Sequence, residues 1–248
     1  MTDAELAARL ADEAGALLLA LRAEGKLEGK ALGAEADARA NELLVSALRR
    51  ERPDDALLSE EEKDSAARLS ASRCWIVDPL DGTREYGEGR SDWAVHVALA
   101  IDGHAASGAV ALPGLGLVLR SDAPIPLSEG QDPPRLLVSR TRPAAEAQAV
   151  ARVLGGTLVP MGSAGAKAMA VVRGEAEIYL HTGGQYEWDN CAPIAVAQAA
   201  GLHVSRIDGS ALRYNNPDPY LPDLLICRKE WARPVLAAVA ALDLPEKQ

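Results

Sequence analysis

Phenylalanine is absent from this chain of 248 residues, and its aromatic residues are four tryptophans and five tyrosines. The core must therefore be built mainly from aliphatic side chains. Hydrophobic residues make up 48% of the chain, which is enough for a sizeable core and excludes an intrinsically disordered protein. The length fits one large domain or two tightly joined lobes.

Cysteine is also scarce. Cys74, Cys191 and Cys227 lie far apart and form no CxxC pair, which argues against a disulfide framework or a zinc site and suits a reducing cytosol. The N-terminus has no basic segment followed by an apolar one, and no apolar run is long enough to span a bilayer. We therefore expect a soluble, cytoplasmic protein whose thiols are buried and inert.

Positive charge is in deficit, because 26 Lys and Arg residues stand against 36 Asp and Glu residues and give a formal net charge of -10. The cationic residues are scattered along the chain, so neither nucleic acid nor an anionic membrane is expected as a partner. An acidic protein that acts on a small anion needs a local source of positive charge. Bound metal ions are the obvious candidates.

Periodic apolar patterns predict helices and strands along the whole chain. Thr2 and Glu5 form a capping box for a first helix that ends near Gly25. Segment 25–33 has three glycines and is expected to be a mobile loop, and Asp102-Gly103 predicts a β-hairpin. The expected strands are 56–58, 74–77, 93–101, 105–112, 116–120, 136–138, 176–180 and 224–227, and the further helices are 35–50, 143–154, 167–173, 190–200 and one after Glu230.

Segment 121–134 is rich in Pro, Ser, Asp and Gly and is the predicted lobe boundary. The pattern predicts an antiparallel sheet before this segment and alternating strands and helices after it. An α/β or α+β layered fold follows. Its N-terminal α+β lobe, 1–128, would carry the metal site and the antiparallel sheet, and its C-terminal α/β lobe, 129–248, would complete the metal and substrate site.

The most informative stretch is the hexapeptide Asp78-Pro79-Leu80-Asp81-Gly82-Thr83. Pro79 is expected to end the preceding strand and turn the chain, so that Asp78 and Asp81 converge with the Leu80 carbonyl between them. Three such oxygens suit Mg²⁺. If a helix begins at Gly82 and Thr83, its free N–H groups could hold a phosphate. A solvated Asp-Gly turn is an equally good interpretation of the same hexapeptide.

Three other acidic residues have ordinary explanations when each is taken alone. Glu60 lies in a charge run that could be a solvated loop. Asp189 stands where a helix should begin and could be its N-cap. Asp37 is expected in the first turn of the second helix, where acids complement the helix dipole. Their order along the chain, rather than any one of them, is the specific signal.

That order resembles the inositol monophosphatase-like family of metal-dependent, lithium-sensitive phosphatases. The resemblance rests on LLSEE around Glu60, WIVDPLDGT from Trp75 to Thr83, EWD from Glu187 to Asp189, and AAGLHVSRIDGSALRYN from Ala199 to Asn215. It runs over essentially the whole chain. It implies an α-β-α-β-α sandwich whose site lies between two lobes. Homodimers are common in the family, and this is the only basis for expecting one.

The resemblance also implies a role for each matching residue. Glu60, Asp78 and the Leu80 carbonyl would hold one Mg²⁺, and Asp78, Asp81 and Asp189 a second, with Glu60 helping a weaker third ion. Asp37 and Thr83 would orient and deprotonate the attacking water, and the Gly82 and Thr83 amides would stabilise the phosphoryl oxygens. The four histidines are expected to be packing or surface residues.

Within the family, the chain most resembles the branch that releases AMP from 3′-phosphoadenosine 5′-phosphate, an activity of sulfur assimilation. Ser139 and Arg140 end a matching strand, and Gly162-Ser163 with Lys167 resembles a phosphate-contacting loop. A surface helix lysine is the alternative for Lys167. Thr182 stands where inositol-specific members carry a glutamate. The competing hypotheses are an inositol 1-phosphate or fructose 1,6-bisphosphate phosphatase and, in another class, a non-catalytic metal and nucleotide sensor.

Overall fold

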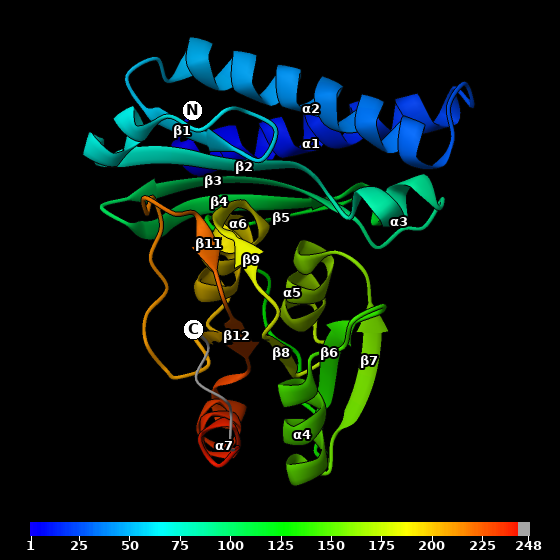
Figure 1. Cartoon of the computed structure of the whole chain (residues 1–248), viewed down its shortest axis with the longest axis vertical. Coiled ribbons are helices and arrows are strands. Elements are labelled where there is room, and N and C mark those ends of the chain that lie inside the picture. The colour runs from blue at the N-terminus through cyan, green and yellow to red at the C-terminus, as the bar shows by residue number, and fades with distance from the viewer. Residues whose placement is uncertain (243–248) are drawn as a thin grey trace.

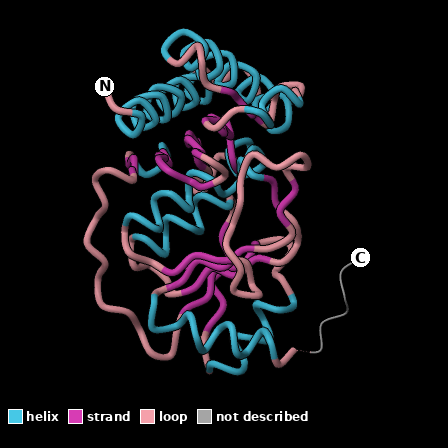
Figure 2. Tube along the Cα trace, turned by 90° about the vertical axis from the view of Figure 1, so that its left-hand side faces the viewer, coloured by secondary structure: helices cyan, strands magenta, loops and turns pink. Residues whose placement is uncertain are grey.

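The computed structural model describes residues 1–242 and shows five layers that alternate between helices and sheets (Figure 1). Two long helices cover a five-stranded sheet, two shorter helices lie beneath it, and a second five-stranded sheet and two more helices complete the stack. The same order is visible after a turn of 90° (Figure 2). This is the predicted α-β-α-β-α sandwich, so the predicted fold class is confirmed.

The first layer consists of α1 (Asp3–Ala23) and α2 (Gly29–Glu51). The predicted capping box is present, because the Glu5 amide donates to Thr2 Oγ1 at 3.2 Å and the Thr2 amide donates to Glu5 Oε2 at 2.8 Å. The prediction of a loop over 25–33 is wrong for its second half, which belongs to α2. A Cβ at Gly87 would lie only 2.7 Å from the Gly29 carbonyl oxygen, so the start of α2 packs tightly against the end of the short helix α3 (Thr83–Gly87).

The upper sheet has the strand order β1-β2-β3-β4-β5, in which β1 and β2 are parallel and the other pairs are antiparallel. Asp102 and Gly103 both have positive φ and close the predicted hairpin between β3 and β4. The strands are β1 (Ala56–Ser59), β2 (Arg73–Asp81), β3 (Ala94–Ile101), β4 (His104–Leu112) and β5 (Leu117–Arg120).

The lower sheet has the order β10-β12-β8-β6-β7. Strand β7 was not predicted, because it is largely exposed and contains Pro160; an edge position tolerates both features. A separate ribbon, β9 (Gln185–Tyr186) with β11 (Tyr220–Leu221), lies beside α6. The lower strands are β6 (Arg135–Ser139), β7 (Thr157–Met161), β8 (Ile178–His181), β10 (His203–Ser205) and β12 (Leu224–Cys227).

The remaining helices fill and close the stack. Between the sheets lie α5 (Ala164–Val172) and α6 (Glu187–Ala199), and α4 (Ala145–Leu154) and α7 (Lys229–Ala240) cover the lower face. Three short helical segments, Ala66–Ser70, α3 (Thr83–Gly87) and Pro113–Leu115, sit in connections. Within residues 1–242, no helix combines the length and apolarity that a membrane crossing requires.

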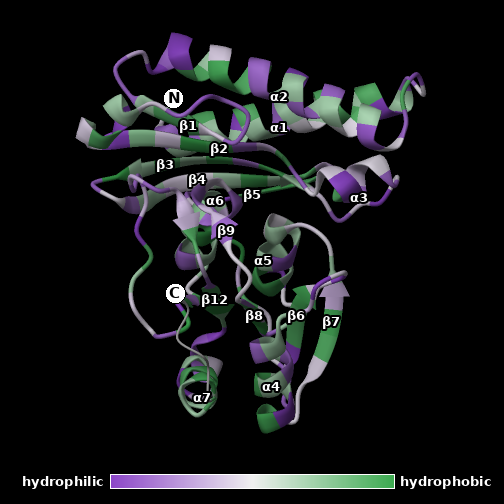
Figure 3. Ribbon diagram, in the orientation of Figure 1, coloured by the Kyte–Doolittle hydropathy of each residue, from purple (hydrophilic) through white to green (hydrophobic). Residues whose placement is uncertain are grey.

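Apolar side chains gather between the layers in three clusters, and the strands of both sheets are correspondingly hydrophobic (Figure 3). Leu6, Leu44 and Trp75 belong to the upper cluster, and Met169 and Ile194 to the central one. All three cysteines are buried and unpaired with each other, as predicted. Because both sheets are packed on two faces, their strand ends are fixed supports for a functional site.

Candidate active site

The two aspartates of the hexapeptide lie at a bulge in β2. Asp78 pairs with His96 and Asp81 pairs with Ala94, so Pro79 and Leu80 of β2 stand opposite the single residue Val95 of β3. The expectation that β2 stops at Pro79 is therefore wrong, since the pairing resumes at Asp81. The predicted consequence still holds, because both carboxylates converge on one buried site.

Asp189 joins this pair from α6. One oxygen from each of Asp78, Asp81 and Asp189 lies within 4.8 Å of the others. Asp189 is not the N-cap of α6 but its third residue, and its Oδ2 accepts a 2.6 Å hydrogen bond from the Tyr186 amide. Burial, together with the charge of Asp81, raises the pKa of Asp189 to about 6.

Glu60 completes the acidic cluster, which consists of Glu60, Asp78, Asp81 and Asp189. It follows β1, and its amide donates to the Val77 carbonyl at 3.3 Å. Desolvation of its carboxyl group and the charge of Asp189 raise its pKa to about 7. Desolvation and the charge of Glu60 raise the pKa of Asp78 well above its usual value. Carboxylates that lie this close together repel one another and therefore bind protons or metal ions.

Asp81 behaves differently because donors surround it. Its carboxylate accepts hydrogen bonds from Ser163 Oγ at 2.5 Å, from the Ala164 amide at 3.1 Å and from the Gly165 amide at 2.6 Å. His96 Nε2 lies 3.3 Å away. Burial opposes ionisation of Asp81, but the interactions with His96, Ser163 and Gly165 prevail and lower its pKa to about 2. The lowered pKa makes Asp81 the member of the cluster that is ionised most readily.

His96 was expected to be a packing or surface residue, and sequence reasoning missed its contact with the cluster. The side chain is fully buried between Asp81 and the Trp188 carbonyl, which its Nδ1 approaches at 2.9 Å. A Cβ at Gly165 would collide with His96 Nε2, so only glycine fits there. The strand register, in which His96 faces Asp78, is the structural cause, and the sequence pattern gave no signal for it.

Asp37 and Thr83 meet beside the cluster. Thr83 Oγ1 lies 3.2 Å from Asp37 Oδ2 and 3.1 Å from the Leu80 carbonyl oxygen. Asp37 lies well inside α2, so its expected place in the first helical turn is wrong. Its Oδ1 is buried without a hydrogen-bond partner in the described chain. Burial and the charge of Glu61 raise the pKa of Asp37 to about 7, which suits a group that exchanges protons at neutral pH.

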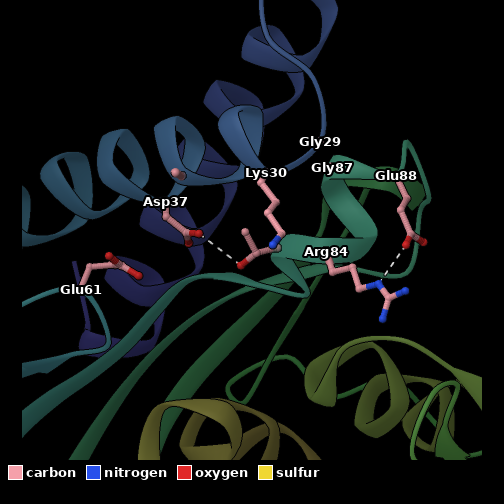
Figure 4. Close-up of a pocket in the computed structure, with 9 residues that line it drawn as sticks. Gly29, Lys30, Asp37, Glu61, Arg84, Gly87 and Glu88 are labelled. Carbon is pink, nitrogen blue, oxygen red and sulfur yellow. Dashed lines mark hydrogen bonds and ion pairs between the residues drawn. The ribbon is translucent and has the colours of Figure 1, made fainter.

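Two hollows open onto this machinery. The first, about 770 Å³, is lined by Lys30, Asp37, Thr83, Arg84 and Glu88 among others, and Figure 4 shows Asp37 at one side of it and Arg84 with Glu88 at the other. The second, about 600 Å³, begins at the acidic cluster and continues between the sheets. Arg84 lines both of them. The second hollow is lined by Asp81, Gly82, Arg84, Glu85, Ser139, Arg140, Thr141, Arg142, Gly162, Ser163, Ala164, Lys167, Tyr179, His181, Gly184, Gln185, Tyr186 and Asp189.

The structure brings five of the expected substrate residues into this second hollow, namely Gly82, Ser139, Arg140, Ser163 and Lys167, whereas Thr83 lines the first. Ser163 caps α5, and its Oγ accepts from the Ala166 amide at 2.9 Å. Gly82 has a φ of 90°, and a Cβ there would lie 3.1 Å from that of Ser163, so the two backbones approach closely. Ser139 Oγ accepts from the Arg142 amide at 3.2 Å.

Lys167 is not the surface lysine that was considered as the alternative, because it is 5% exposed. Its Nζ donates to the Gly162 and Ser163 carbonyls and lies 5.3 Å from the centre of the Tyr179 ring. Burial lowers its pKa, although the charge of Asp81 opposes the shift. Lys167 therefore places an ammonium group at the floor of the hollow.

Arg140 is held by two acids. Its Nη2 donates to Glu85 Oε1 at 2.9 Å and to Glu88 Oε2 at 2.8 Å. Glu85, to which the sequence assigned no role, also approaches Gly162 so closely that a Cβ there would lie 2.3 Å from its side chain; the contact fixes the loop before α5. Thr182 is neutral and donates to Glu146.

The donor set of the acidic cluster fits a hard divalent cation. Its available atoms are carboxylate oxygens and the Leu80 carbonyl, with no thiolate among them, and such ligands suit Mg²⁺ better than Zn²⁺. The clustered negative charge needs a cation for balance at neutral pH. The raised pKa values of Asp78, Glu60 and Asp189 result from burial and from this crowding of negative charge.

The pKa shifts predict how metal and pH act on stability. The pKa values of Glu60 and Asp189 are higher in the folded protein than in the unfolded chain, so protonation of these two groups stabilises the metal-free fold at low pH. This stabilisation is lost as the pH rises through about 6 to 7. Mg²⁺ should therefore raise the melting temperature by about 5–10 °C near pH 8 and by far less near pH 5.5, where protons compete for the ligands. Thermal scans with Mg²⁺ and with NaCl of equal ionic strength check this. Equal shifts at the two pH values would contradict it.

Comparison with known proteins agrees with this geometry. The model of the "Inositol monophosphatase family" matches residues 3–242. The "3'-phosphoadenosine 5'-phosphate phosphatase" of Mycobacterium leprae is 52% identical over 254 residues, 96% of this chain and 93% of its own length. The "3'(2'),5'-bisphosphate nucleotidase CysQ" of Escherichia coli K12 is 30% identical over 204 residues, 75% of this chain and 80% of its own.

Solved structures share the fold. CysQ from Bacteroides thetaiotaomicron, described as a bacterial member of the inositol monophosphatase family, superposes with a TM-score of 0.76 at 26% identity, over 90% of this chain and 96% of that one. An inositol monophosphatase from Anabaena superposes with a TM-score of 0.77 at 22% identity, over 96% and 95%, and supports the fold alone. The chain belongs to the inositol monophosphatase family.

Proposed function

We propose that this chain is a Mg²⁺-dependent, Li⁺-sensitive phosphatase that hydrolyses the 3′-phosphate of 3′-phosphoadenosine 5′-phosphate to give AMP and phosphate. The observation that carries the chemistry is the Asp37–Thr83 pair, with its unpartnered carboxylate oxygen, beside an acidic cluster. The 52% identity to a relative named for this substrate supports the choice of ester.

The acidic cluster would hold the metal ions. Glu60, Asp78 and the Leu80 carbonyl would bind one Mg²⁺, and Asp78, Asp81 and Asp189 a second, with Glu60 helping a weaker third. Bound Mg²⁺ would supply positive charge for the phosphate and lower the pKa of the attacking water. Asp78 is the ligand common to both ions, and its burial at the β2 bulge fixes its position.

Asp37 and Thr83 would handle the proton. The Thr83 hydroxyl lies between Asp37 Oδ2 and the Leu80 carbonyl, so it can donate to one of them while it accepts from water. Asp37, with a pKa of about 7, can then take up the proton. The water would attack phosphorus in line with the ester oxygen, and that oxygen would leave as the 3′-oxygen of AMP and take up a proton from a second water to become a hydroxyl. The Gly82 and Thr83 amides would stabilise the charge on the phosphoryl oxygens.

The second phosphate of the substrate would meet cations in the second hollow. The sequence pointed to Ser139, Arg140, Ser163 and Lys167. Arg140 is already bonded to Glu85 and Glu88, and Lys167 to two carbonyls. Among the described residues that line this hollow, Arg142 is the exposed guanidinium with no acidic partner, and it completes the set of cations for a 5′-phosphate.

Identification of the product tests this proposal. Incubation of 3′-phosphoadenosine 5′-phosphate with the protein and Mg²⁺ should release AMP with one phosphate, and chromatography separates AMP from adenosine 3′-phosphate. Addition of EDTA or Li⁺ should stop the release. Appearance of adenosine 3′-phosphate would contradict the assigned orientation. Hydrolysis of inositol 1-phosphate or fructose 1,6-bisphosphate alone would favour those competing substrates, and binding of metal and nucleotide without any turnover would favour the sensor.

A further inference from the structure

Most aromatic rings of this protein are buried, but two lie open beside the acidic cluster. Trp75, Trp93, Tyr86 and Tyr179 are fully buried, whereas Tyr186 and Tyr220 are each 45% exposed. Tyr186 also lines the second hollow. Exposed rings of this size leave apolar surface in water, and at the mouth of a cavity such surface is available to a ligand.

The exposed rings form an ordered stack. Tyr186 and Trp188 lie parallel, with an angle of 8° between their planes and 4.8 Å between their centres. Tyr220 meets Tyr186 edge-on, at 78° and 5.9 Å. Trp188 therefore covers one face of the Tyr186 ring, and Tyr186 nevertheless remains 45% exposed.

The backbone holds this stack rigidly. Tyr186 and Tyr220 are register partners in the β9–β11 ribbon (Figure 1). The Gly184 amide donates to the Pro222 carbonyl at 3.2 Å, and the Glu187 amide donates to the Pro219 carbonyl at 2.9 Å. Gly184 has a φ of 80°, and a Cβ there would collide with the Tyr220 ring, so the glycine allows this ring to close on the ribbon.

The stack is also tied to the acidic cluster. The Tyr186 amide donates to Asp189 Oδ2 at 2.6 Å, so the residue that presents the ring also orients a carboxylate of the cluster. A ligand that spans the hollow from Asp189 to Tyr186 would thus meet charge at one end and an aromatic face at the other. A nucleotide has this distribution of groups, whereas a phosphorylated polyol lacks the aromatic part.

Building on the proposed function, we propose that Tyr186, backed by Trp188 and bordered by Tyr220, is the stacking platform for the purine base of the substrate. Base stacking on an exposed aromatic ring accepts any base but rejects ligands without one. The platform is a specificity determinant separate from the metal and proton chemistry, because the Tyr186 side chain takes part in neither.

Substitution of the ring tests the platform. Tyr186→Ala should raise KM for 3′-phosphoadenosine 5′-phosphate and Kd for AMP by about 10-fold or more, with little change in kcat. Tyr186→Phe keeps the ring and should behave like the wild type. Inhibition by inorganic phosphate, which needs no base, should be equal in all three proteins. The Asp189 hydrogen bond comes from the backbone, so the Mg²⁺ concentration for half-maximal activity should not move.

The outcomes separate the platform from the proposed function. Wild-type kinetics and AMP binding in Tyr186→Ala would overturn the platform and leave the proposed function standing. Equal weakening of AMP and inorganic phosphate would also overturn it, because the ring would then act on the whole site. If the wild type fails to hydrolyse 3′-phosphoadenosine 5′-phosphate, the proposed function is wrong. In that case, AMP binding that is weakened by Tyr186→Ala would still support the platform. AMP binding that does not depend on the ring would overturn the platform as well as the proposed function.

Discussion

Replacement of Asp78 by asparagine is expected to abolish turnover while the protein remains folded. Asp78 is 1% exposed, its Oδ2 lies 4.0 Å from His96 Nδ1, and it is the proposed ligand of two ions. Loss of several kcal/mol of charge stabilisation in the transition state corresponds to about a 1,000-fold or greater fall in kcat/KM. Phosphate release at saturating Mg²⁺ measures it.

The stability of Asp78→Asn makes this prediction sharper. Burial and the charge of Glu60 raise the pKa of Asp78, so its ionised form opposes folding of the metal-free protein. Asparagine should leave the melting temperature without metal unchanged or higher, and should remove most of the Mg²⁺-induced rise. Asp12→Asn, on the exposed side of α1, is the matched control and should change neither quantity. Substantial activity in Asp78→Asn would refute the metal assignment.

Removal of the hydroxyl at position 83 is expected to cost about 100-fold to 10,000-fold in kcat, because proton transfer from the attacking water loses its relay. Thr83→Val preserves the branched shape that packs against α2, where a Cβ at Gly33 would lie 2.6 Å from Thr83 Cγ2. Asp37→Asn should give a loss of similar size, since the base itself is neutralised. Steady-state kinetics with saturating substrate measures both.

The rescue variant distinguishes chemistry from packing. Thr83→Ser keeps the hydroxyl and should recover most of the activity that Thr83→Val loses. The double variant, Asp37→Asn with Thr83→Val, should be hardly worse than either single one, because residues that act as a unit are not additive. Fully multiplicative losses would mean that Asp37 and Thr83 act separately.

Local patterns were sufficient to predict much of the upper sheet. The Asp102-Gly103 turn fixed the hairpin between β3 and β4, and the capping box fixed the start of α1. Residues 29–34 escaped prediction because Gly29 and Gly33 have low helix propensity, and only close packing against α3 compensates for it. Strand β7 escaped because it is an exposed edge with a proline.

The candidate site was predictable only in part. The hexapeptide supported a metal site and a solvated turn equally, and the family resemblance decided between them. The structure places Asp78, Asp81 and Asp189 together, as that resemblance implied. No local pattern could show that His96 faces Asp81 or that Glu85 holds Arg140, because strand register and loop packing create these contacts.

Comparison of kcat/KM for 3′-phosphoadenosine 5′-phosphate, inositol 1-phosphate and fructose 1,6-bisphosphate, with Mg²⁺ and again with added Li⁺, is the most direct test of the whole account. We expect the nucleotide to be preferred by about 100-fold or more, as base stacking and the contacts to a second phosphate together predict, and we expect Li⁺ to suppress the reaction. A preference for inositol 1-phosphate or fructose 1,6-bisphosphate would contradict the assignment of the second hollow to a nucleotide.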